Sequence, residues 1–216
     1  MADVFFPHVV RRQPLFVIGY PGDVGGANTE CWHTIRLWRR FGMDVTVLPT
    51  WHAEPTWRTR LDGIGCPTIE ALPDELDKVP CLPGGVVVSF CNSHFLREAA
   101  RFQALGCRII WLGCMNWLLA GERKHYAAAK PFDAYVFQSR YQQSELQPQL
   151  AKFGVRAEQC HQVRGALAWD EFPFRPLAHR AGVPLVVGRI SRSSPDKHAS
   201  HTWSIYERIG QPLRAR

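Results

Sequence analysis

A glycine-rich stretch near the N-terminus, GYPGDVGGANTE at residues 19–30, has the composition of a ligand-binding turn. It follows the apolar run LFVIGY at residues 15–20 and precedes a segment whose apolar residues have helical spacing. A glycine-rich turn between a strand and a helix lets backbone N–H groups approach an anion or a sugar hydroxyl. The spacing G-x-x-G-x-x-G-G fits neither the dinucleotide fingerprint nor the P-loop. A tight turn that binds no ligand is the alternative interpretation.

Polar side chains also follow two further apolar runs. Asn92 and His94 come after GVVVSFC at residues 85–91, and Asn116 comes after CRIIWLG at residues 107–113. At the carboxyl edge of a parallel sheet the asparagine amides can hydrogen-bond to hydroxyl groups, and His94 stands near a bound ligand. A role in helix capping or in the core explains each of these residues equally well.

The elements that must position these residues are predicted from hydrophobic periodicity. Short β-rich runs alternate with helix-length amphipathic segments along most of the chain. We predict strands over 15–20, 43–49, 85–91, 107–113 and 133–139, helices over 28–41, 94–105 and 140–153, and a further helical segment before residue 133. This alternation predicts the α/β class, with a Rossmann-like parallel sheet and helices on both of its faces. The proline-rich stretch from Trp51 to Pro83 gives no clear pattern.

The pattern changes near the C-terminal end of the chain. We predict that residues 1–171 form the Rossmann-like domain and that FPFRPLAHRAGVP at 172–184, with three prolines, is a linker. Residues 185–216 then contain a strand (PLVVGRI), a polar loop and a helix (HTWSIYERIG). About 30 residues bury too little surface to fold alone. We therefore expect this segment to be the start of an incomplete second domain.

Composition excludes several classes of protein. The 216 residues are 46% hydrophobic and 21% charged, which is typical of a globular protein. The longest nearly apolar run, residues 109–120, has 12 residues, whereas a membrane-spanning helix needs roughly 20. The arginines of the N-terminal stretch come after its short apolar piece and not before it, so we expect no secretory signal. The seven cysteines form no C-x-x-C pair, so we expect reduced thiols, a cytoplasmic protein and no metal site.

Positive charge is concentrated at one end of the chain. The net charge is +7, and residues 151–216 hold 11 Lys and Arg against 5 Asp and Glu, which leaves six of the seven charges in this segment. This asymmetry favours an anionic partner near the C-terminal end, either a nucleic acid or a nucleotide diphosphate. No run of Lys and Arg interleaved with aromatic residues is present, so we expect no nucleic-acid binding.

Two distant segments resemble GT-B-fold glycosyltransferases of the family 4-like group. GDVGGANTE and the helix that ends in RRFGMDVTVLP are similar to the N-terminus of these enzymes, where a glycine pair precedes a helix and a G-x-x-V-T-V strand. VVGRISRSSPDKH resembles the beginning of their C-terminal domain. Between these segments, VFQSRYQQSEL and VRGALAWDEFPFRP resemble the last strand of the N-terminal domain and the crossing into the linker.

The resemblance implies a site shared between two domains. Gly25 and Gly26 would line the floor of the cleft, and Arg189 and Lys197 would neutralise the donor diphosphate. His94 would be the catalytic residue that orients the acceptor or polarises the transferred sugar. The acceptor would be bound by three asparagines, Asn28, Asn92 and Asn116. Because Arg and Lys would balance the charge of the leaving group, neither a metal nor another cofactor is expected.

The implied reaction is transfer of a sugar from a nucleotide-sugar donor to a hydroxyl of a glycan or small-molecule acceptor. In the family the donor is held chiefly by the second domain, most of which the sequence lacks, so we expect little or no transfer by this chain alone. A truncated reading frame, a half-enzyme completed by a second polypeptide and a binding module remain as explanations. The alternative function is a non-catalytic nucleotide- or carbohydrate-binding α/β module.

Overall fold

The computed structural model describes residues 13–23, 25–49, 54–171 and 200–214. The chain divides into two compact units, Met1–Phe172 and Pro173–Arg216, which are described separately. In the second unit the helix expected over HTWSIYERIG is present as α6, Thr202–Arg214. The predicted linker at 172–184 and the strand PLVVGRI lie outside the described residues.

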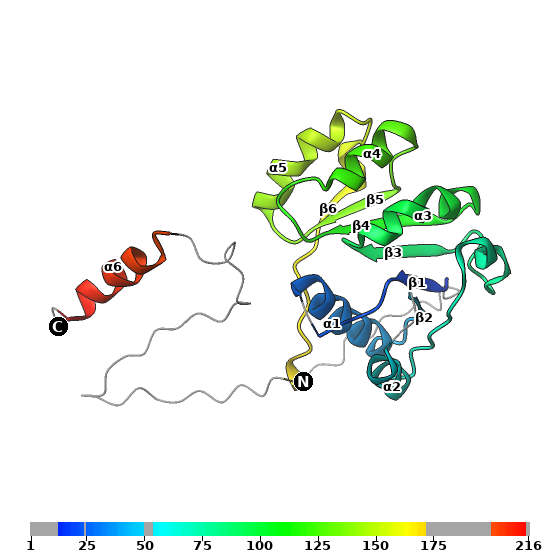
Figure 1. Cartoon of the computed structure of the whole chain (residues 1–216), viewed down its shortest axis with the longest axis horizontal. Helices are drawn as coiled ribbons and strands as arrows, with labels where there is room; N and C mark the ends of the chain where they lie inside the picture. Colours follow the sequence, from blue (N-terminus) through cyan, green and yellow to red (C-terminus); the bar gives the residue numbers. More distant parts are fainter. Residues whose placement is uncertain (1–12, 24, 50–53, 172–199, 215–216) are drawn as a thin grey trace. The chain divides into compact units, whose positions relative to one another are not determined.

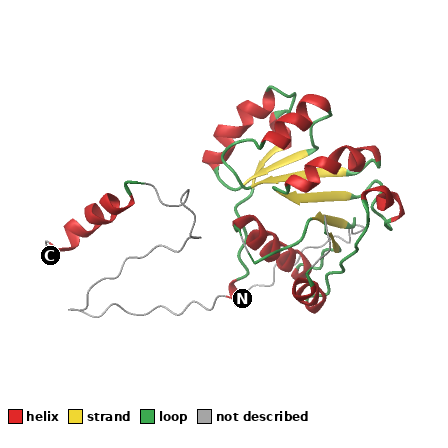
Figure 2. Ribbon diagram, in the orientation of Figure 1, coloured by secondary structure: helices red, strands yellow, loops and turns green. Residues whose placement is uncertain are grey.

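The first unit is built on a six-stranded sheet in which every neighbouring pair of strands is parallel (Figures 1 and 2). The strand order is β2-β1-β3-β4-β5-β6. The strands are β1 Leu15–Ile18, β2 Val45–Leu48, β3 Val86–Phe90, β4 Arg108–Gly113, β5 Ala134–Phe137 and β6 Cys160–Gln162. The predicted parallel, Rossmann-like sheet is therefore confirmed, with one additional edge strand, β6.

Helices cover both faces of this sheet, as predicted (Figure 2). The helices of the first unit are α1 Gly26–Arg40, α2 Pro55–Gly63, α3 Ser93–Ala104, α4 Ala120–Ala128 and α5 Arg140–Ala151, with 3-10 turns η1 Pro73–Lys78, η2 Ala157–Gln159 and η3 Trp169–Glu171. Side chains that alternate along the strands divide the core in two. One half, including Val17 and Val88, packs with α1 and α2. The other half, including Phe16 and Ile109, packs with α3, α4, α5 and η1.

Two helix boundaries follow from local chemistry. The side chain of Asn92 accepts hydrogen bonds from the first turn of α3, which confirms the predicted cap. Gly42 adopts a φ of 72° immediately after α1, a conformation that only glycine adopts at low cost. Asn92 thus sets where α3 begins, and Gly42 lies where α1 ends and the chain leads on to β2.

The sheet has a topological switch point between β1 and β3. From β1 the chain crosses to β2 on one side and then returns to β3 on the other. The helices that follow β1 and β3 lie on opposite faces of the sheet, α1 on one and α3 on the other. In open α/β sheets, ligands bind in the crevice at this point.

After β6 the chain crosses α1, and hydrogen bonds hold it there. The segment 163–171 runs beside α1 and ends in η3 (Figure 1). Trp32 donates its indole N–H to Glu171 Oε1 at 2.9 Å. The buried backbone N–H of Ala168 donates to Nδ1 of His33 at 3.3 Å. The segment that leads out of the domain is thus fixed against the middle of α1.

Charged side chains reinforce the same contact. Arg36 forms ion pairs of 2.7 Å with both Asp170 and Glu171. The guanidinium of Arg60 lies 4.5 Å from the ring centroid of Trp32, which joins α2 to the same group. The Arg36 side chain is only 19% exposed, so water screens these pairs less than it would at the open surface.

Candidate functional site

The loops after β1 and β3 touch at the switch point. Gly19 has a φ of 94°, and a Cβ built on it would stand 2.3 Å from Nδ2 of Asn92. Oδ1 of the same asparagine accepts hydrogen bonds from the backbone N–H groups of His94, at 2.8 Å, and Phe95, at 3.2 Å. The Asn92 amide therefore occupies the space that a side chain at Gly19 would need, and it sets the start of α3.

The two glycines at the start of α1, Gly25 and Gly26, differ in whether backbone conformation explains why the residue is a glycine. Gly25 adopts a φ of 101°, so the backbone conformation alone accounts for glycine there. Gly26 has no such conformation, and a Cβ on it would meet no described atom within 4 Å. Neither backbone strain nor packing in the described chain requires glycine at Gly26. A ligand that comes close to the backbone at Gly26 would explain why this residue is a glycine.

The N-terminus of α1 is electrostatically open. Within the described residues no side chain caps it, and its first turn contains no acidic residue. The first N–H groups of a helix lack intrahelical partners and carry the positive end of the helix dipole. The turn that begins at Gly26 therefore offers backbone donors to an anion or a hydroxyl.

Glu30 links α1 to the end of β5. It lies one turn after Gly26 on α1, and Gln138, at the end of β5, donates its side-chain N–H to Glu30 Oε2. Nε2 of Gln138 is also 3.8 Å from Sγ of Cys114, just after β4. A Cβ on Gly165 would stand 3.2 Å from Glu30 Oε1. Burial raises the pKa of the Glu30 carboxyl above its ordinary value.

A pair of thiols lies at the ends of β3 and β4. The thiol of Cys114 hydrogen-bonds to Cys91, which lowers the pKa of Cys91 and raises that of Cys114. Cys91 has a φ of 50°, a left-handed conformation that is uncommon for a residue with a side chain. Both residues are half-buried. Their spacing in the sequence matches no cysteine motif, so the pair could not be predicted.

A pocket of about 130 Å³ opens where β1 and β2 end, beneath the first turns of α3. The last residues of the two strands, Ile18 and Leu48, are register partners and line one wall. His94 and Phe95 of α3 line another wall, and η1 contributes Leu76. His94, the predicted catalytic residue, therefore stands at a pocket mouth on the edge of the sheet where ligands are expected.

The predicted site residues fall into three groups. Gly25 and Gly26 lie at the start of α1, in the connection after β1, whereas Asn92 and His94 lie at the start of α3, after β3. Asn28 turns back toward its own loop, since a Cβ on Gly22 would stand 2.9 Å from Asn28 Nδ2, and Asn116 is exposed in the loop after β4. The predicted donor-binding residues Arg189 and Lys197 lie outside the described residues.

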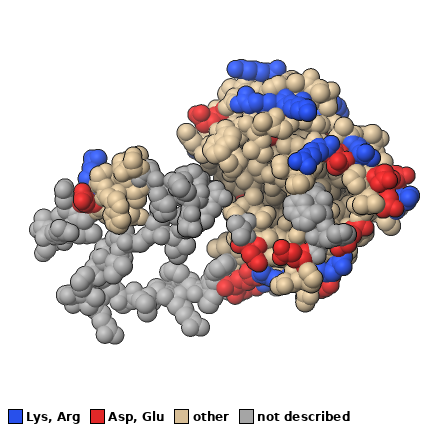
Figure 3. Space-filling model, viewed as in Figure 1, with Lys and Arg blue, Asp and Glu red and all other residues tan. Residues whose placement is uncertain are grey.

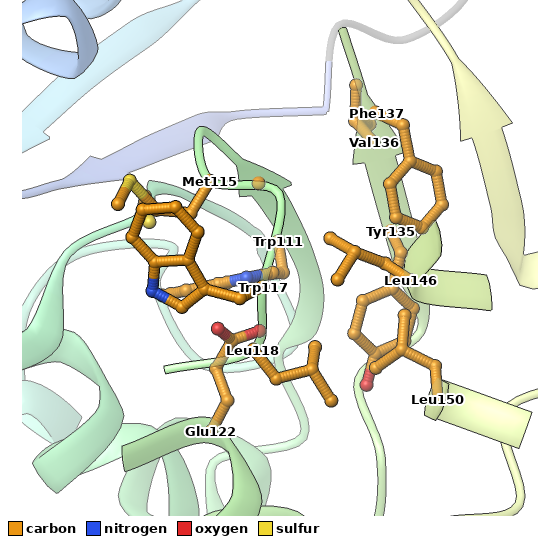
Figure 4. Close-up of a pocket in the computed structure, with 12 residues that line it drawn as sticks. Trp111, Met115, Trp117, Leu118, Glu122, Tyr135, Val136, Phe137, Leu146 and Leu150 are labelled. Carbon is orange, nitrogen blue, oxygen red and sulfur yellow. The ribbon is translucent and has the colours of Figure 1, made fainter. Parts of the chain in front are cut away.

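A second cavity, shown in Figure 4, surrounds the buried carboxyl of Glu122 but is too small for a ligand. Its volume is about 10 Å³, room for no more than a water molecule. Glu122 is 4% exposed and accepts hydrogen bonds from the backbone N–H of Leu119 at 2.8 Å and the hydroxyl of Tyr126 at 3.2 Å. Burial raises the pKa of Glu122. This carboxyl fixes the start of α4 within the core.

Charge is mixed on the surface of the first unit. On the face shown in Figure 3, Lys and Arg side chains occur in separate groups with Asp or Glu near most of them. Among the described residues, no three His, Cys, Asp or Glu side chains gather closely enough to hold a metal ion. The described helices include none with both the length and the apolar composition that crossing a membrane requires.

Comparison with solved structures identifies the fold. HepE of Anabaena in complex with UDP-glucose superposes with a TM-score of 0.52 at 14% sequence identity, covering 76% of this chain and 47% of that one. The complex of HepE with UDP and glucose gives a TM-score of 0.50 at 14% identity, with the same coverage. The fold is a glycosyltransferase-like Rossmann fold.

The structural match covers only part of the HepE chain. This chain spans about half the length of the HepE structures that it matches. No protein-family model matches the sequence, and no curated protein matches it. The comparisons therefore support the glycosyltransferase-like fold but do not select the family 4-like group.

Proposed function

We propose that the first unit is the acceptor-side half of a GT-B-type, family 4-like glycosyltransferase. The completed enzyme would transfer a sugar from a nucleotide-sugar donor to a hydroxyl of an acceptor. The donor-binding half would be supplied by further sequence or by a second polypeptide. Arg189 and Lys197 would begin that half and would neutralise the donor diphosphate. The reaction would need no metal and would take place in the cytoplasm.

The observation that carries this proposal is the open turn at Gly26. It lies at the switch point of a sheet that superposes on HepE bound to UDP-glucose. Glycine at this position has no explanation in the described chain, because a Cβ there would meet no atom within 4 Å. In the proposal a sugar or phosphate group of the donor fills that space and accepts hydrogen bonds from the uncapped N–H groups of α1.

The acceptor is assigned to the other side of the switch point. His94 stands at the mouth of the pocket below α3, and Asn92 holds the turn that positions it. In the proposal His94 orients the acceptor hydroxyl toward the donor sugar. Positioning of this kind lowers the barrier because the two reactants meet already aligned.

The test is a titration of the isotopically labelled chain with UDP-glucose, UDP and GDP, followed by the amide signals of Gly25, Gly26 and Ala27. We expect these signals to shift on addition of UDP-glucose. The variant Gly26→Ala should fold normally and bind at least about tenfold more weakly, because its methyl group fills the ligand's space.

The matched control is Gly63→Ala on α2, where a Cβ likewise meets nothing within 4 Å. It should bind like the wild type. Absence of any nucleotide-dependent shift, or equal binding by Gly26→Ala, would contradict the donor assignment. Nucleotide binding without transfer, even when a donor-binding half is added, would instead favour the non-catalytic binding module.

A further inference from the structure

The pocket below His94 has an apolar interior. Eight of its lining residues are aliphatic, aromatic or proline: Ile18, Leu48, Pro49, Ala71, Pro73, Leu76, Phe95 and Phe102. Its volume of about 130 Å³ is below the roughly 300–1,000 Å³ of a pocket that encloses a whole small ligand. The pocket is therefore suited to one apolar part of a ligand whose remainder stays outside.

Charged side chains line the mouth of the pocket. Arg97 and Glu98 of α3 line it together with His94. Glu98 pairs with Arg101 at 2.9 Å, which offsets its charge. Within the described part of the chain, Arg97 makes no ion pair or hydrogen bond. His94 and Arg97 are three residues apart on α3, so both lie on the same side of the helix.

The first turn of α3 lies beside Arg97 at this mouth. It contains no acidic residue that would oppose the positive end of the helix dipole, and Glu98, further along the helix, is paired with Arg101. A carboxylate or phosphate near Arg97 would receive charge-assisted hydrogen bonds, while an apolar group attached to it would be removed from water in the pocket.

We propose that the acceptor is amphipathic, with an apolar or aromatic body in this pocket and an anionic head group on Arg97. This inference rests on the proposed function, because it assigns the acceptor subsite of that same site. The body contributes hydrophobic burial against Leu76 and Phe95. The head fixes its orientation, so that a hydroxyl near His94 faces the open turn of α1.

The experiment uses four simple probes: 2-naphthyl phosphate, 2-naphthoate, 2-naphthol and inorganic phosphate. Binding to the chain is measured by calorimetry and by shifts of the α3 amide signals. The two anionic naphthyl probes should bind about tenfold more tightly than 2-naphthol, and inorganic phosphate should bind far more weakly than either. A preference between the two anions would distinguish a phosphate head from a carboxylate head.

Two variants test the two halves of the subsite. Arg97→Gln should bring the anionic probes down to the affinity of 2-naphthol and leave 2-naphthol unchanged. Ala71→Phe, at a partly buried position, should fill the pocket and weaken all three naphthyl probes at least about tenfold. Ala71→Met is the replacement if the phenylalanine variant does not fold. Arg123→Gln, on α4 and away from the pocket, is the matched control.

The inference would be overturned if no naphthyl probe binds, if the pocket-filling variant binds normally, or if Arg97→Gln keeps the preference for anions. Equal affinity for inorganic phosphate and 2-naphthyl phosphate would also overturn it, since the apolar body would then contribute nothing. The nucleotide titration is independent of these probes. Shifts with UDP-glucose but not with the naphthyl probes would refute this inference alone, whereas the converse would refute the donor assignment alone.

Discussion

Asn92 and Gly19 are in contact at the carboxyl edge of the sheet, with Nδ2 of the asparagine 2.3 Å from where a Cβ of Gly19 would stand. The contact joins the ends of β1 and β3, the two strands that flank the switch point. The oxygen of this amide caps α3, and its nitrogen occupies the space that a side chain at Gly19 would need. The geometry of the candidate cleft depends on this pair.

Gly19→Ala should therefore lower the free energy of unfolding of the domain by more than the strain of its positive φ alone would. A φ of 94° costs an alanine about 1–2 kcal/mol, and overpacking against Asn92 adds about 1–3 kcal/mol. Gly154→Ala is the control, since Gly154 has a φ of 83° and a Cβ there meets nothing within 4 Å. Urea denaturation gives both free energies of unfolding. Equal losses for the two variants would show that the contact is unimportant.

The carboxyl of Glu30 should make stability depend on pH. Burial raises its pKa above the ordinary 4.5, so the folded state keeps a proton that the unfolded chain has already released. Stability from this group is therefore lost as the pH rises through the raised pKa. Glu30→Gln cannot ionise, so its free energy of unfolding relative to wild type should increase from about pH 4 to about pH 7.

The control for this measurement is Glu145→Gln, at an exposed position of α5. Its pH dependence of unfolding should follow that of the wild type. A constant difference between Glu30→Gln and wild type across the pH range would mean that Glu30 is not buried as described.

The thiol pair makes a prediction about reactivity. Cys114→Ala removes the hydrogen bond that lowers the pKa of Cys91, so the pKa of Cys91 should rise. The rate of alkylation of Cys91 by iodoacetamide, followed by mass spectrometry against pH, reports this pKa because the thiolate is the reactive form. A Cys81→Ser background removes the exposed thiol. An unchanged pH profile would rule out the hydrogen bond.

The contact between segment 163–171 and α1 should depend on Glu171. Glu171→Ala removes the acceptor of the Trp32 indole and an ion-pair partner of Arg36, at a cost of about 1–3 kcal/mol. Glu171→Gln keeps an oxygen for the indole and should lose less. Hydrogen exchange at Ala168 and thermal unfolding measure the two effects. Glu158→Ala, whose partner Arg156 is at the surface, should leave the melting temperature close to that of the wild type.

Most of the sheet could be predicted because its strands carry their own signal. The apolar runs of β1, β3 and β4 are buried on both faces, so their composition alone distinguishes them. Strand β6 could not be predicted, because Cys160–Gln162 has no β pattern and its conformation comes from pairing with β5. In the stretch from Trp51 to Pro83, α2 and η1 are held by tertiary packing of Trp57 and Leu76.

The candidate site was predictable only where local chemistry sets it. Asn92 and His94 come soon after β3, and Gly25 and Gly26 lie in the longer connection after β1, so strand prediction places all four on the carboxyl side of the sheet, while their roles stay predictions. Glu30 and Gln138 are separated by 108 positions and nothing local pairs them, so their contact required the folded chain. The roles of Arg189 and Lys197 stay predictions.

The chain leaves the first unit from a fixed point on α1, and this has a consequence for anything attached beyond it. Glu171 is bonded to Trp32, which lies about 9 Å along the helix axis from Gly26. A polypeptide joined after Glu171 is thereby tethered next to the open turn. If it is the proposed donor-binding half, its encounters with a donor group held there are intramolecular, and the two would meet at a high effective concentration even if its own affinity for this unit were low.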